Sequence, residues 1–351
     1  MLSFNDTADR VWDKLDERYT KIIIENERPI DYPREETGFH LFRLHPKRPL
    51  QFIQSLYHLA TSKVIIIDNY FGFLSVTNFK AGARVVQLWH ANGAIKKFGL
   101  QDPAIARRSS KARKRFQRVY DRFDQVVVGS NKMMAIFQES FGLESSHFLK
   151  TGIPRTDFFF DQQEIDQRQA ELLRQYPMIN GRKVILYAPT FREDQLHAPD
   201  LALDVDRMAE TLSEEYVLLV RLHPAVSQQT AISAGDFVLD VSAYPNVNHL
   251  LTVTDILITD YSSIPFEFAL LERPMIFFPY DLEAYERERG FWEPYIEQMP
   301  GPVVFTSDEL LQVIQEQDFD LEQVRRFCQE WNPYTDGMAA DRLTDSIEKA
   351  P

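Results

Sequence analysis

Short apolar runs alternate with amphipathic stretches along most of the chain. The runs are four to five residues long, nearly continuous in hydrophobicity and rich in β-branched residues. Strands that are buried on both faces have this pattern, which is typical of a parallel sheet covered by helices. The predicted strands are Lys63–Ile67, Arg84–Leu88, Gln125–Val128, Val184–Tyr187, Tyr216–Val220, Asp255–Thr259 and Met275–Phe278.

Helical periodicity fills the intervals between these strands. The stretches predicted as helices include Arg48–Ala60, Ala104–Arg122, Lys132–Glu139, Ile165–Gln175, Leu203–Glu214 and Ser263–Leu271. Alternation of strands and helices at this spacing indicates an α/β, doubly wound architecture.

The alternation is interrupted once, at Thr151–Gln169, where a Gly/Pro turn and a polar stretch precede a new strand. A chain of 351 residues fits two domains of ordinary size. We therefore predict one domain over residues 1–155 and a second over residues 156–351, each Rossmann-like. Two such halves bind ligands in a cleft at the carboxyl ends of their strands.

The composition is that of a folded protein, with 44% hydrophobic and 26% charged residues. The single cysteine, Cys328, excludes an internal disulfide and a cysteine-built zinc site, and it favours a reducing compartment. No apolar run approaches the roughly 20 residues needed to span a bilayer. The charged amino-terminal stretch lacks the apolar core of a secretory signal. We therefore expect a cytoplasmic protein whose membrane contact, if it has one, is peripheral.

The net charge of −13 is unevenly distributed. Between Lys96 and Arg122 there are ten Lys or Arg residues and two acids, so this window carries +8 and the rest of the chain −21. Proteins that bind nucleic acid usually present a basic domain, so nucleic acid is not an expected partner. One concentrated basic segment fits contact with phosphate or anionic lipid at a single place.

Candidate catalytic residues stand directly after the predicted strands. His90 follows Arg84–Leu88 and precedes a glycine-containing loop with Lys96 and Lys97. A histidine at a strand's carboxyl end, beside lysines, suits proton transfer next to a phosphate. The structural alternative is a histidine that only caps the turn.

Two further strand ends carry polar side chains. Thr190 and Arg192 follow Val184–Tyr187, and the planar fork of Arg192 suits phosphate, although such an arginine is more often a surface ion-pair partner. His223 follows Tyr216–Val220, with Arg221 two residues earlier on the same strand face.

Ser262 and Ser263 lie where the strand Asp255–Thr259 gives way to a helix. The start of a helix offers free backbone N–H groups and a positive dipole end, which together bind phosphate oxygens. The alternative is that one serine simply caps the helix. Glu267 lies a turn further on and can accept hydrogen bonds from ribose hydroxyls, unless it belongs to a solvated helix face.

The sequence contains no motif for several other kinds of enzyme site. The sequence lacks a G-x-x-x-x-G-K-[ST] loop, which excludes a P-loop kinase, and no dinucleotide fingerprint follows a strand. It also lacks H-E-x-x-H and clustered His/Asp ligand sets, so neither a metal nor another cofactor is indicated.

Taken together, the strand-end segments resemble the CDP-glycerol glycerophosphotransferases of bacterial wall teichoic acid synthesis, a family with a GT-B fold. One difference is that Ala91–Ala94 follow Trp-His where the family often has Gly-Thr-Pro. The matching segments are LWHANGAIKKFG (88–99), VVVGSNKMMAIFQESFG (126–142), KTGIPRTD (150–157), ILYAPTFRED (185–194), RLHP (221–224) and TDYSSIPFEFALLERPMIFFPYDLEAY (259–285).

The resemblance implies that the carboxyl-terminal domain binds CDP-glycerol and that two histidines, here His90 and His223, carry the reaction. The residues that match the family's donor-binding segment are Asp260, Ser262, Ser263 and Glu267. The implied acceptor is a polyprenyl-diphosphate-linked saccharide on the inner leaflet of the plasma membrane. In size the chain resembles the family's primases, which add the first glycerol phosphate.

The basic segment then fits an acceptor- and membrane-facing role. Its candidate residues are Lys96, Lys97, Arg107, Arg108, Lys111 and Arg113. An exposed charged helix without a lipid role is the alternative. Other open alternatives are a second-step or CDP-ribitol-using transferase of the same family, another GT-B nucleotide-sugar glycosyltransferase, and a protein that binds nucleotide or lipid without turnover.

Overall fold

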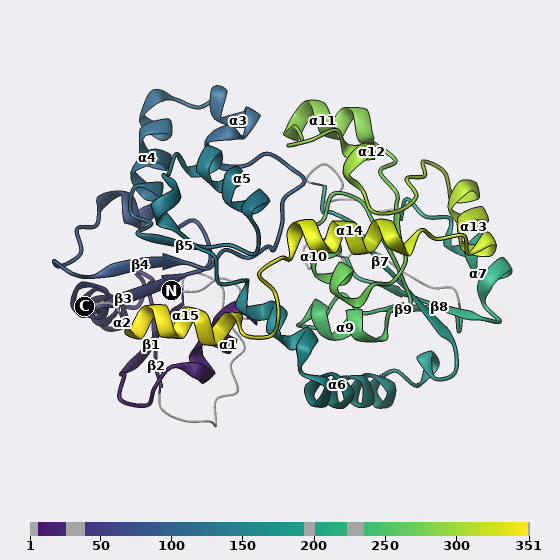
Figure 1. The fold of residues 1–351 in the computed structure, drawn as a ribbon, viewed down its shortest axis with the longest axis horizontal. Coiled ribbons are helices and arrows are strands. Elements are labelled where there is room, and N and C mark those ends of the chain that lie inside the picture. Colours follow the sequence, from purple (N-terminus) through teal and green to yellow (C-terminus); the bar gives the residue numbers. More distant parts are fainter. Residues whose placement is uncertain (1–5, 26–38, 193–200, 223–234, 350–351) are drawn as a thin grey trace. The chain divides into compact units, whose positions relative to one another are not determined.

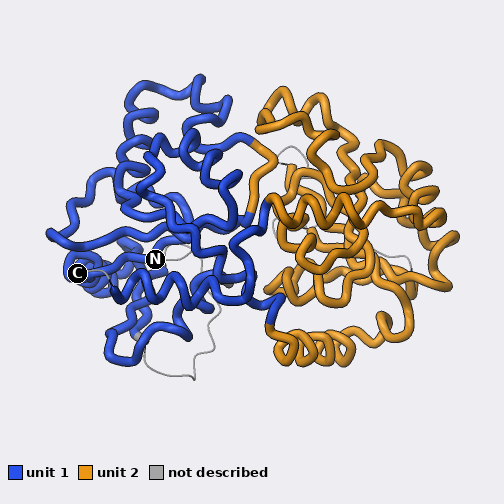
Figure 2. The backbone as a smooth tube through the Cα atoms, viewed as in Figure 1, with its two compact units in different colours: residues 1–92, 97–160, 331–351 blue, residues 93–96, 161–330 orange. Residues whose placement is uncertain are grey.

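The computed structural model of the chain describes residues 6–25, 39–192, 201–222 and 235–349. The chain divides into two compact units (Figure 2). Unit 1 comprises residues 1–92, 97–160 and 331–351, and unit 2 comprises residues 93–96 and 161–330.

Unit 1 is built on parallel strands. Four of them pair in the order β3-β4-β5-β6, and a separate parallel pair is formed by β1 and β2. The bounds are β1 Lys21–Glu25, β2 Phe39–Arg43, β3 Val64–Ile67, β4 Arg84–Gln87, β5 Gln125–Val127 and β6 Phe148–Leu149.

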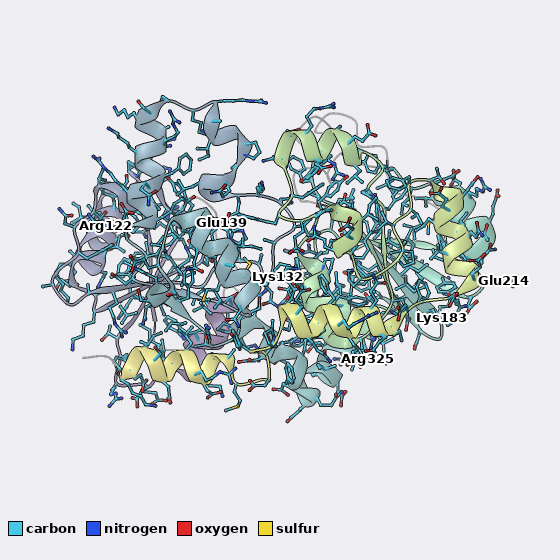
Figure 3. The ribbon with its side chains drawn as sticks, turned by 45° about the horizontal axis from the view of Figure 1, so that its top comes forward. Arg122, Lys132, Glu139, Lys183, Glu214 and Arg325 are labelled. Atoms are coloured by element: carbon cyan, nitrogen blue, oxygen red, sulfur yellow. The ribbon has the colours of Figure 1, made fainter. Side chains whose placement is uncertain are left out.

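Helices at both ends of the chain complete unit 1 (Figure 1). Val11 of α1 and Leu343 of α15 share one buried cluster with Val86 and Val127 of the sheet. On α5, the ammonium of Lys132 lies 4.7 Å from the centroid of the Trp331 ring (Figure 3). The bounds are α1 Asp6–Lys14, α2 Pro49–Thr61, α3 Pro103–Ala106, α4 Ser110–Tyr120, α5 Asn131–Phe141 and α15 Ala339–Glu348.

Unit 2 holds a five-stranded parallel sheet in the order β11-β10-β7-β8-β9. The chain runs from β7 to β8 and β9 on one side, and then returns to place β10 and β11 on the other side of β7. The strand order therefore reverses between β7 and β10. The bounds are β7 Lys183–Ala188, β8 Tyr216–Val220, β9 Val238–Asp240, β10 Ile256–Thr259 and β11 Met275–Phe277.

Both faces of this sheet are buried. Ile185 and Leu218 pack with Met208 of α7 and Leu310 of α13 in one cluster, while the alternate strand residues, such as Leu186, are buried as well. The helices are α6 Gln162–Gln175, α7 Val205–Leu212, α9 Val247–Val253, α10 Ile264–Phe268, α11 Leu282–Arg289, α12 Tyr295–Gln298, α13 Ser307–Glu316 and α14 Leu321–Trp331. Burial on two faces is the physical reason why these strands read as continuous apolar runs.

All seven predicted strands are confirmed to within one residue at either end. The strands β1, β2, β6 and β9 were not among them. Two of these, β6 and β9, have only two and three residues, too few for a periodic pattern. The predicted helix over Ala104–Arg122 is wrong in one respect, because it is two helices. The break occurs at Ser109, whose hydroxyl accepts a hydrogen bond from the Ala112 N–H at 3.2 Å and so starts α4 as an N-cap.

The division of the chain also differs from the predicted domains of residues 1–155 and 156–351. The change of unit falls at residues 160/161, residues 93–96 belong to unit 2, and residues 331–351 return to unit 1. The carboxyl-terminal segment is held there by contacts distant in sequence, such as the hydrogen bond from Arg84 Nη2 to the Ile347 carbonyl at 2.7 Å. In the parts of the chain that the structure describes, no helix combines the length and apolarity of a membrane span.

Candidate functional site

The loop after β4 begins with an unusual backbone conformation. Trp89 has a φ of 61°, a left-handed value that is rare for a bulky residue. Its N–H donates to Gln87 Oε1 at 2.8 Å, and its ring stacks on Phe98 and on His90. These contacts hold the strained turn and set the direction in which His90 leaves the strand.

The His90 ring has a defined hydrogen-bonding pattern. Nδ1 lies 3.1 Å from the carbonyl oxygen of Asp68, the residue that follows β3. Because a carbonyl oxygen can only accept, we infer that Nδ1 carries the hydrogen, so the lone pair of the neutral ring is on Nε2. The main-chain carbonyl of His90 accepts a hydrogen bond from Arg155 Nη1 at 3.0 Å. An oriented ring with a basic Nε2 is what a general base requires.

The next residues, 93–96, pack within unit 2. A Cβ on Gly93 would lie 2.4 Å from Cδ1 of Phe266, so only glycine fits there without a shift of that ring. The carbonyl of Ile95 accepts a hydrogen bond from the Trp292 N–H at 3.1 Å. Lys96 therefore belongs to unit 2, whereas the other candidate residues of the basic segment belong to unit 1, and its predicted acceptor-facing role stays a prediction.

In unit 2 the polar side chains gather where β7 and β10 end. An open parallel sheet binds ligands at the carboxyl ends of the strands where the strand order reverses, because the two flanking loops separate there. Asp260 directly follows β10 and Thr190 follows β7. The Asp260 carboxylate joins the two strand ends, because its Oδ1 accepts hydrogen bonds from the N–H groups of Thr190 at 2.7 Å and Tyr261 at 2.6 Å.

Arg192 lies between two carboxylates. Its Nε and Nη2 donate to Asp281 at 2.8 and 2.9 Å, and Nη2 also lies 2.9 Å from Asp260 Oδ2. Its Nη1 donates to the Thr190 carbonyl, and the side chain is only 6% exposed. All three nitrogens of Arg192 contact protein oxygens in this structure, so Arg192 holds the strand ends and their acids in place. The expectation that its fork binds phosphate stays a prediction.

The electrostatics of this cluster follow from burial and pairing. Burial alone would raise the pKa of Asp281, but the hydrogen bonds and charge of Arg192 outweigh it and hold that pKa below its ordinary value. Burial alone would lower the pKa of Arg192, but Asp281 and Asp260 raise it above its ordinary value. Burial raises the pKa of Tyr261, whose hydroxyl donates to Asp281 at 2.9 Å. Arg192 and Asp281 therefore remain an ion pair at neutral pH.

The helix expected after β10 is present as α10, followed by a short 3₁₀ turn at Ala269–Leu271. Ser263 occupies the N-cap position but makes no capping hydrogen bond, whereas the Ser262 hydroxyl accepts from the Ile264 N–H at 3.3 Å. The alternative in which Glu267 belongs to a solvated helix face is wrong, because Glu267 is 1% exposed.

Arg221 stands at the end of β8, beside β7. Its N–H donates to the Tyr187 carbonyl at 2.9 Å, and its Nη2 donates to the Tyr244 carbonyl at 3.3 Å. These bonds place Arg221 in the row of strand ends with Thr190 and Asp260. The predicted catalytic residue His223 lies outside the described residues.

The basic segment of unit 1 is exposed over α3, α4 and the turn between them. Arg107, Arg108, Lys111 and Arg113 are exposed, and within the described ranges none of them makes an ion pair. Lys97, which begins this segment, is half-buried. The charges of Arg107, Arg108, Lys111 and Arg113 are therefore available to an external anion, and the Arg108 guanidinium also lies 5.7 Å from the centroid of the Phe116 ring.

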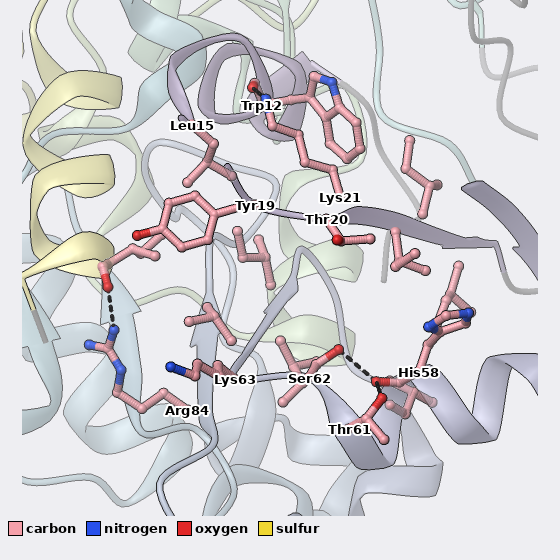
Figure 4. A pocket seen from close by; sticks show the side chains of 18 of the residues that line it. Trp12, Leu15, Tyr19, Thr20, Lys21, His58, Thr61, Ser62, Lys63 and Arg84 are labelled. Carbon is pink, nitrogen blue, oxygen red and sulfur yellow. Dashed lines mark hydrogen bonds between the residues drawn. The ribbon is translucent and has the colours of Figure 1, made fainter. Parts of the chain in front are cut away.

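Unit 1 also contains a cavity of about 610 Å³ (Figure 4). It is lined by α1, β1, the end of α2 and β3, and largely by apolar side chains such as Trp12 and Ile23. Its lining includes Lys63 and Arg84, which stand at the amino ends of β3 and β4. The cavity is thus at the opposite end of these strands from His90 and does not belong to the strand-end site.

Sequence reasoning missed Asp281, Tyr261 and Arg155 as residues of these two strand-end sites. Tyr261 and Asp281 lie within the segment 259–285 that matches the family, and Arg155 lies within the matching segment KTGIPRTD. Membership of these motifs was the only sequence feature that could have identified the three residues. Only the fold shows that they orient Arg192 and the His90 loop.

A model of the family CDP-glycerol:poly(glycerophosphate) glycerophosphotransferase matches residues 43–349. Over 308 residues the chain is 40% identical to the teichoic acid glycerol-phosphate primase of Bacillus subtilis strain 168, covering 88% of this chain and 79% of that protein. It is 38% identical over 310 residues to the teichoic acid poly(ribitol-phosphate) polymerase of Bacillus spizizenii strain W23, covering 87% and 49% of the two chains.

Among solved structures, the wall teichoic acid polymerase TagF superposes with a TM-score of 0.83 at 24% identity, over 98% of this chain and 85% of that one. This likeness shows a shared α/β fold with parallel sheets. The family match over residues 43–349 includes every described strand-end segment, and the primase identity extends over 88% of the chain. The chain therefore belongs to the CDP-glycerol:poly(glycerophosphate) glycerophosphotransferase family.

Proposed function

We propose that the protein is a CDP-glycerol glycerophosphotransferase of teichoic acid synthesis. It adds glycerol phosphate to a polyprenyl-diphosphate-linked saccharide and releases CMP. The observation that carries the proposal is the family match over residues 43–349, which includes both the His90 loop and the strand ends of unit 2. In this proposal each unit is a Rossmann-like domain of a GT-B fold, with the acceptor on unit 1 and the donor on unit 2.

The reaction is an in-line displacement at the glycerol-bearing phosphorus. The acceptor oxygen forms a bond to phosphorus, the bond from phosphorus to the CMP oxygen breaks, and the acceptor proton passes to Nε2 of His90. Arg221, His223 and the backbone N–H groups after Ser262 stabilise charge on the transferred and leaving phosphates. Thr190, Ser263 and Glu267 hold the donor, while Asp260 and Arg192 keep the strand ends in position. Catalysis of this kind depends on positioning and electrostatics.

The test is incubation with CDP-glycerol and a short-chain analogue of the lipid-linked disaccharide, followed by mass measurement. A product heavier by one glycerol phosphate supports a primase, and several additions support a polymerase. Transfer from CDP-ribitol but not from CDP-glycerol would show that CDP-ribitol is the donor substrate. In parallel, CDP-glycerol should raise the melting temperature, because a ligand that binds only the folded state stabilises it, and UDP-sugars should not. Stabilisation by UDP-sugars alone would favour a glycosyltransferase.

We further propose that the basic segment docks the protein peripherally on the cytoplasmic face of the membrane. Each Lys or Arg near an anionic surface contributes roughly 1 kcal/mol. Four Glu substitutions should abolish sedimentation with phosphatidylglycerol vesicles, and phosphatidylcholine vesicles serve as the neutral control. Unchanged sedimentation would refute docking through this segment. The substituted residues are Arg107, Arg108, Lys111 and Arg113.

A further inference from the structure

The backbone around Lys96 is held firmly in unit 2. Lys96 forms an antiparallel bridge with Phe291, and the neighbouring Ile95 carbonyl accepts the Trp292 N–H. Ile95 itself is 3% exposed. The position of the Lys96 backbone is therefore fixed by its contacts with Phe291 and Trp292.

Among the described residues, the Lys96 ammonium makes neither an ion pair nor a hydrogen bond. Its contact is with the Tyr285 ring, whose centroid lies 5.9 Å from Nζ. Asp260 is the carboxylate whose charge acts on it, but the oxygens of Asp260 are occupied by two backbone N–H groups and by Arg192. In the part of the chain that the structure describes, the other charges acting on Lys96 are the positive ones of Arg192 and Arg289.

This is a costly arrangement for a lysine. Burial lowers the pKa of Lys96 to about 8, Asp260 partly opposes the shift, and Arg289 and Arg192 add to it. A half-buried ammonium without a counter-ion is destabilising unless a ligand supplies the opposite charge. Ionisable groups in such surroundings are concentrated at binding and catalytic sites.

The location indicates which ligand it is. Asp260 and Arg192, the two side chains whose charges reach Lys96 from the sheet, follow β10 and β7, where the strand order reverses. Ligands of open parallel sheets bind at this place. We propose that the Lys96 ammonium binds a phosphate oxygen of the donor's diphosphate. This inference rests on the proposed function, since it takes CDP-glycerol as the donor, and it moves Lys96 from the acceptor side to the donor side.

The first experiment compares the affinity for CDP-glycerol by calorimetry at pH 7. Lys96→Met should raise the Kd by roughly ten- to a hundredfold, which is the range expected for loss of a hydrogen bond between two charged groups. Lys183→Met is the matched control, because Lys183 stands at the opposite, amino end of β7 and pairs with Glu215 at the surface (Figure 3). It should leave the Kd unchanged.

The second readout is the pH dependence of donor binding. Because the ammonium loses its proton near pH 8, the wild-type affinity should fall as the pH rises from 7 to 9, and the affinity of Lys96→Met should stay flat. Burial raises the pKa of Tyr285 and of Tyr261, so neither neighbouring phenol titrates in this window. The diphosphate of the donor keeps its charge throughout.

The outcomes separate the two proposals. If the wild type does not bind CDP-glycerol, the proposed function fails and the role of Lys96 fails with it. If the wild type binds but Lys96→Met binds equally well with the same pH profile, only the role of Lys96 is overturned. A measurement on the wild type avoids any folding defect of the variant: the NMR signal of ¹³Cε-labelled Lys96, assigned by its loss in Lys96→Arg, should report a higher pKa when donor is bound. An unchanged pKa would also overturn the inference.

Discussion

Replacement of Arg192 by Met tests the physical account of the strand-end cluster. The Arg192 side chain is 6% exposed and pairs with Asp260 and Asp281, which are 2% and 25% exposed. Met replaces the aliphatic part of the Arg192 side chain, but it leaves the two carboxylates without their cation. Removing one partner of a buried ion pair costs about 3–5 kcal/mol, because the remaining charge has lost both water and its counter-ion. We expect a loss of that size in the stability of unit 2 at pH 7.

The pH dependence follows from the direction of the pKa shifts. In the wild type the pKa of Asp281 is lowered, so its stabilising contribution is present above the ordinary carboxyl pKa near 4 and is lost as the pH falls through the folded-state value. In Arg192→Met the lowering effect of Arg192 is gone and burial should raise the pKa of Asp281, so protonation favours the folded variant. The stability difference between the two proteins should therefore shrink as the pH is lowered from 7 to 5.

The assay is urea unfolding, combined with hydrogen exchange in β7 and β10 to assign the transition to unit 2, because two units need not unfold together. Arg325→Met on α14 is the matched control, since Arg325 pairs with Glu272 at 2.7 Å on the exposed surface of the same unit (Figure 3). Its unfolding midpoint should hardly move. A loss below about 1 kcal/mol in Arg192→Met, or a difference that widens on acidification, would refute the reasoning.

Two further substitutions test the loop after β4. His90→Ala should reduce turnover by roughly 10²–10⁴, which is the usual contribution of a general base. The control is His147→Ala, which removes a similar Nδ1 contact with the Phe123 carbonyl and should retain activity. Near-normal turnover of His90→Ala would remove His90 from the mechanism. Gly93→Ala should destabilise unit 2 by about 1–3 kcal/mol, because the added Cβ displaces the Phe266 ring. Urea unfolding measures this loss of stability. An unchanged unfolding midpoint would show that the ring moves without cost.

Much of the fold is readable in the sequence because it leaves a local signature. Strands buried on both faces are continuous apolar runs, so β7, β8 and β10 were predicted almost to the residue. Their carboxyl ends then pointed to Thr190, Arg221 and Asp260 without any knowledge of the packing. The segments that match the family, in the same order along the chain, indicated the reaction class. Residue identity and order can be read from the sequence without knowing where the side chains lie.

Contacts between distant residues were decided by tertiary structure alone. Arg192 meets Asp281 across 89 positions of sequence, and its fork faces these acids rather than solvent. Lys96 lies within a basic stretch, yet packing against Phe291 and Trp292 brings it to the acids and aromatic rings of unit 2. The local pattern of apolar and polar residues indicates whether a residue is buried. Which residue it contacts depends on how distant strands and loops pack together, and only the tertiary structure shows that.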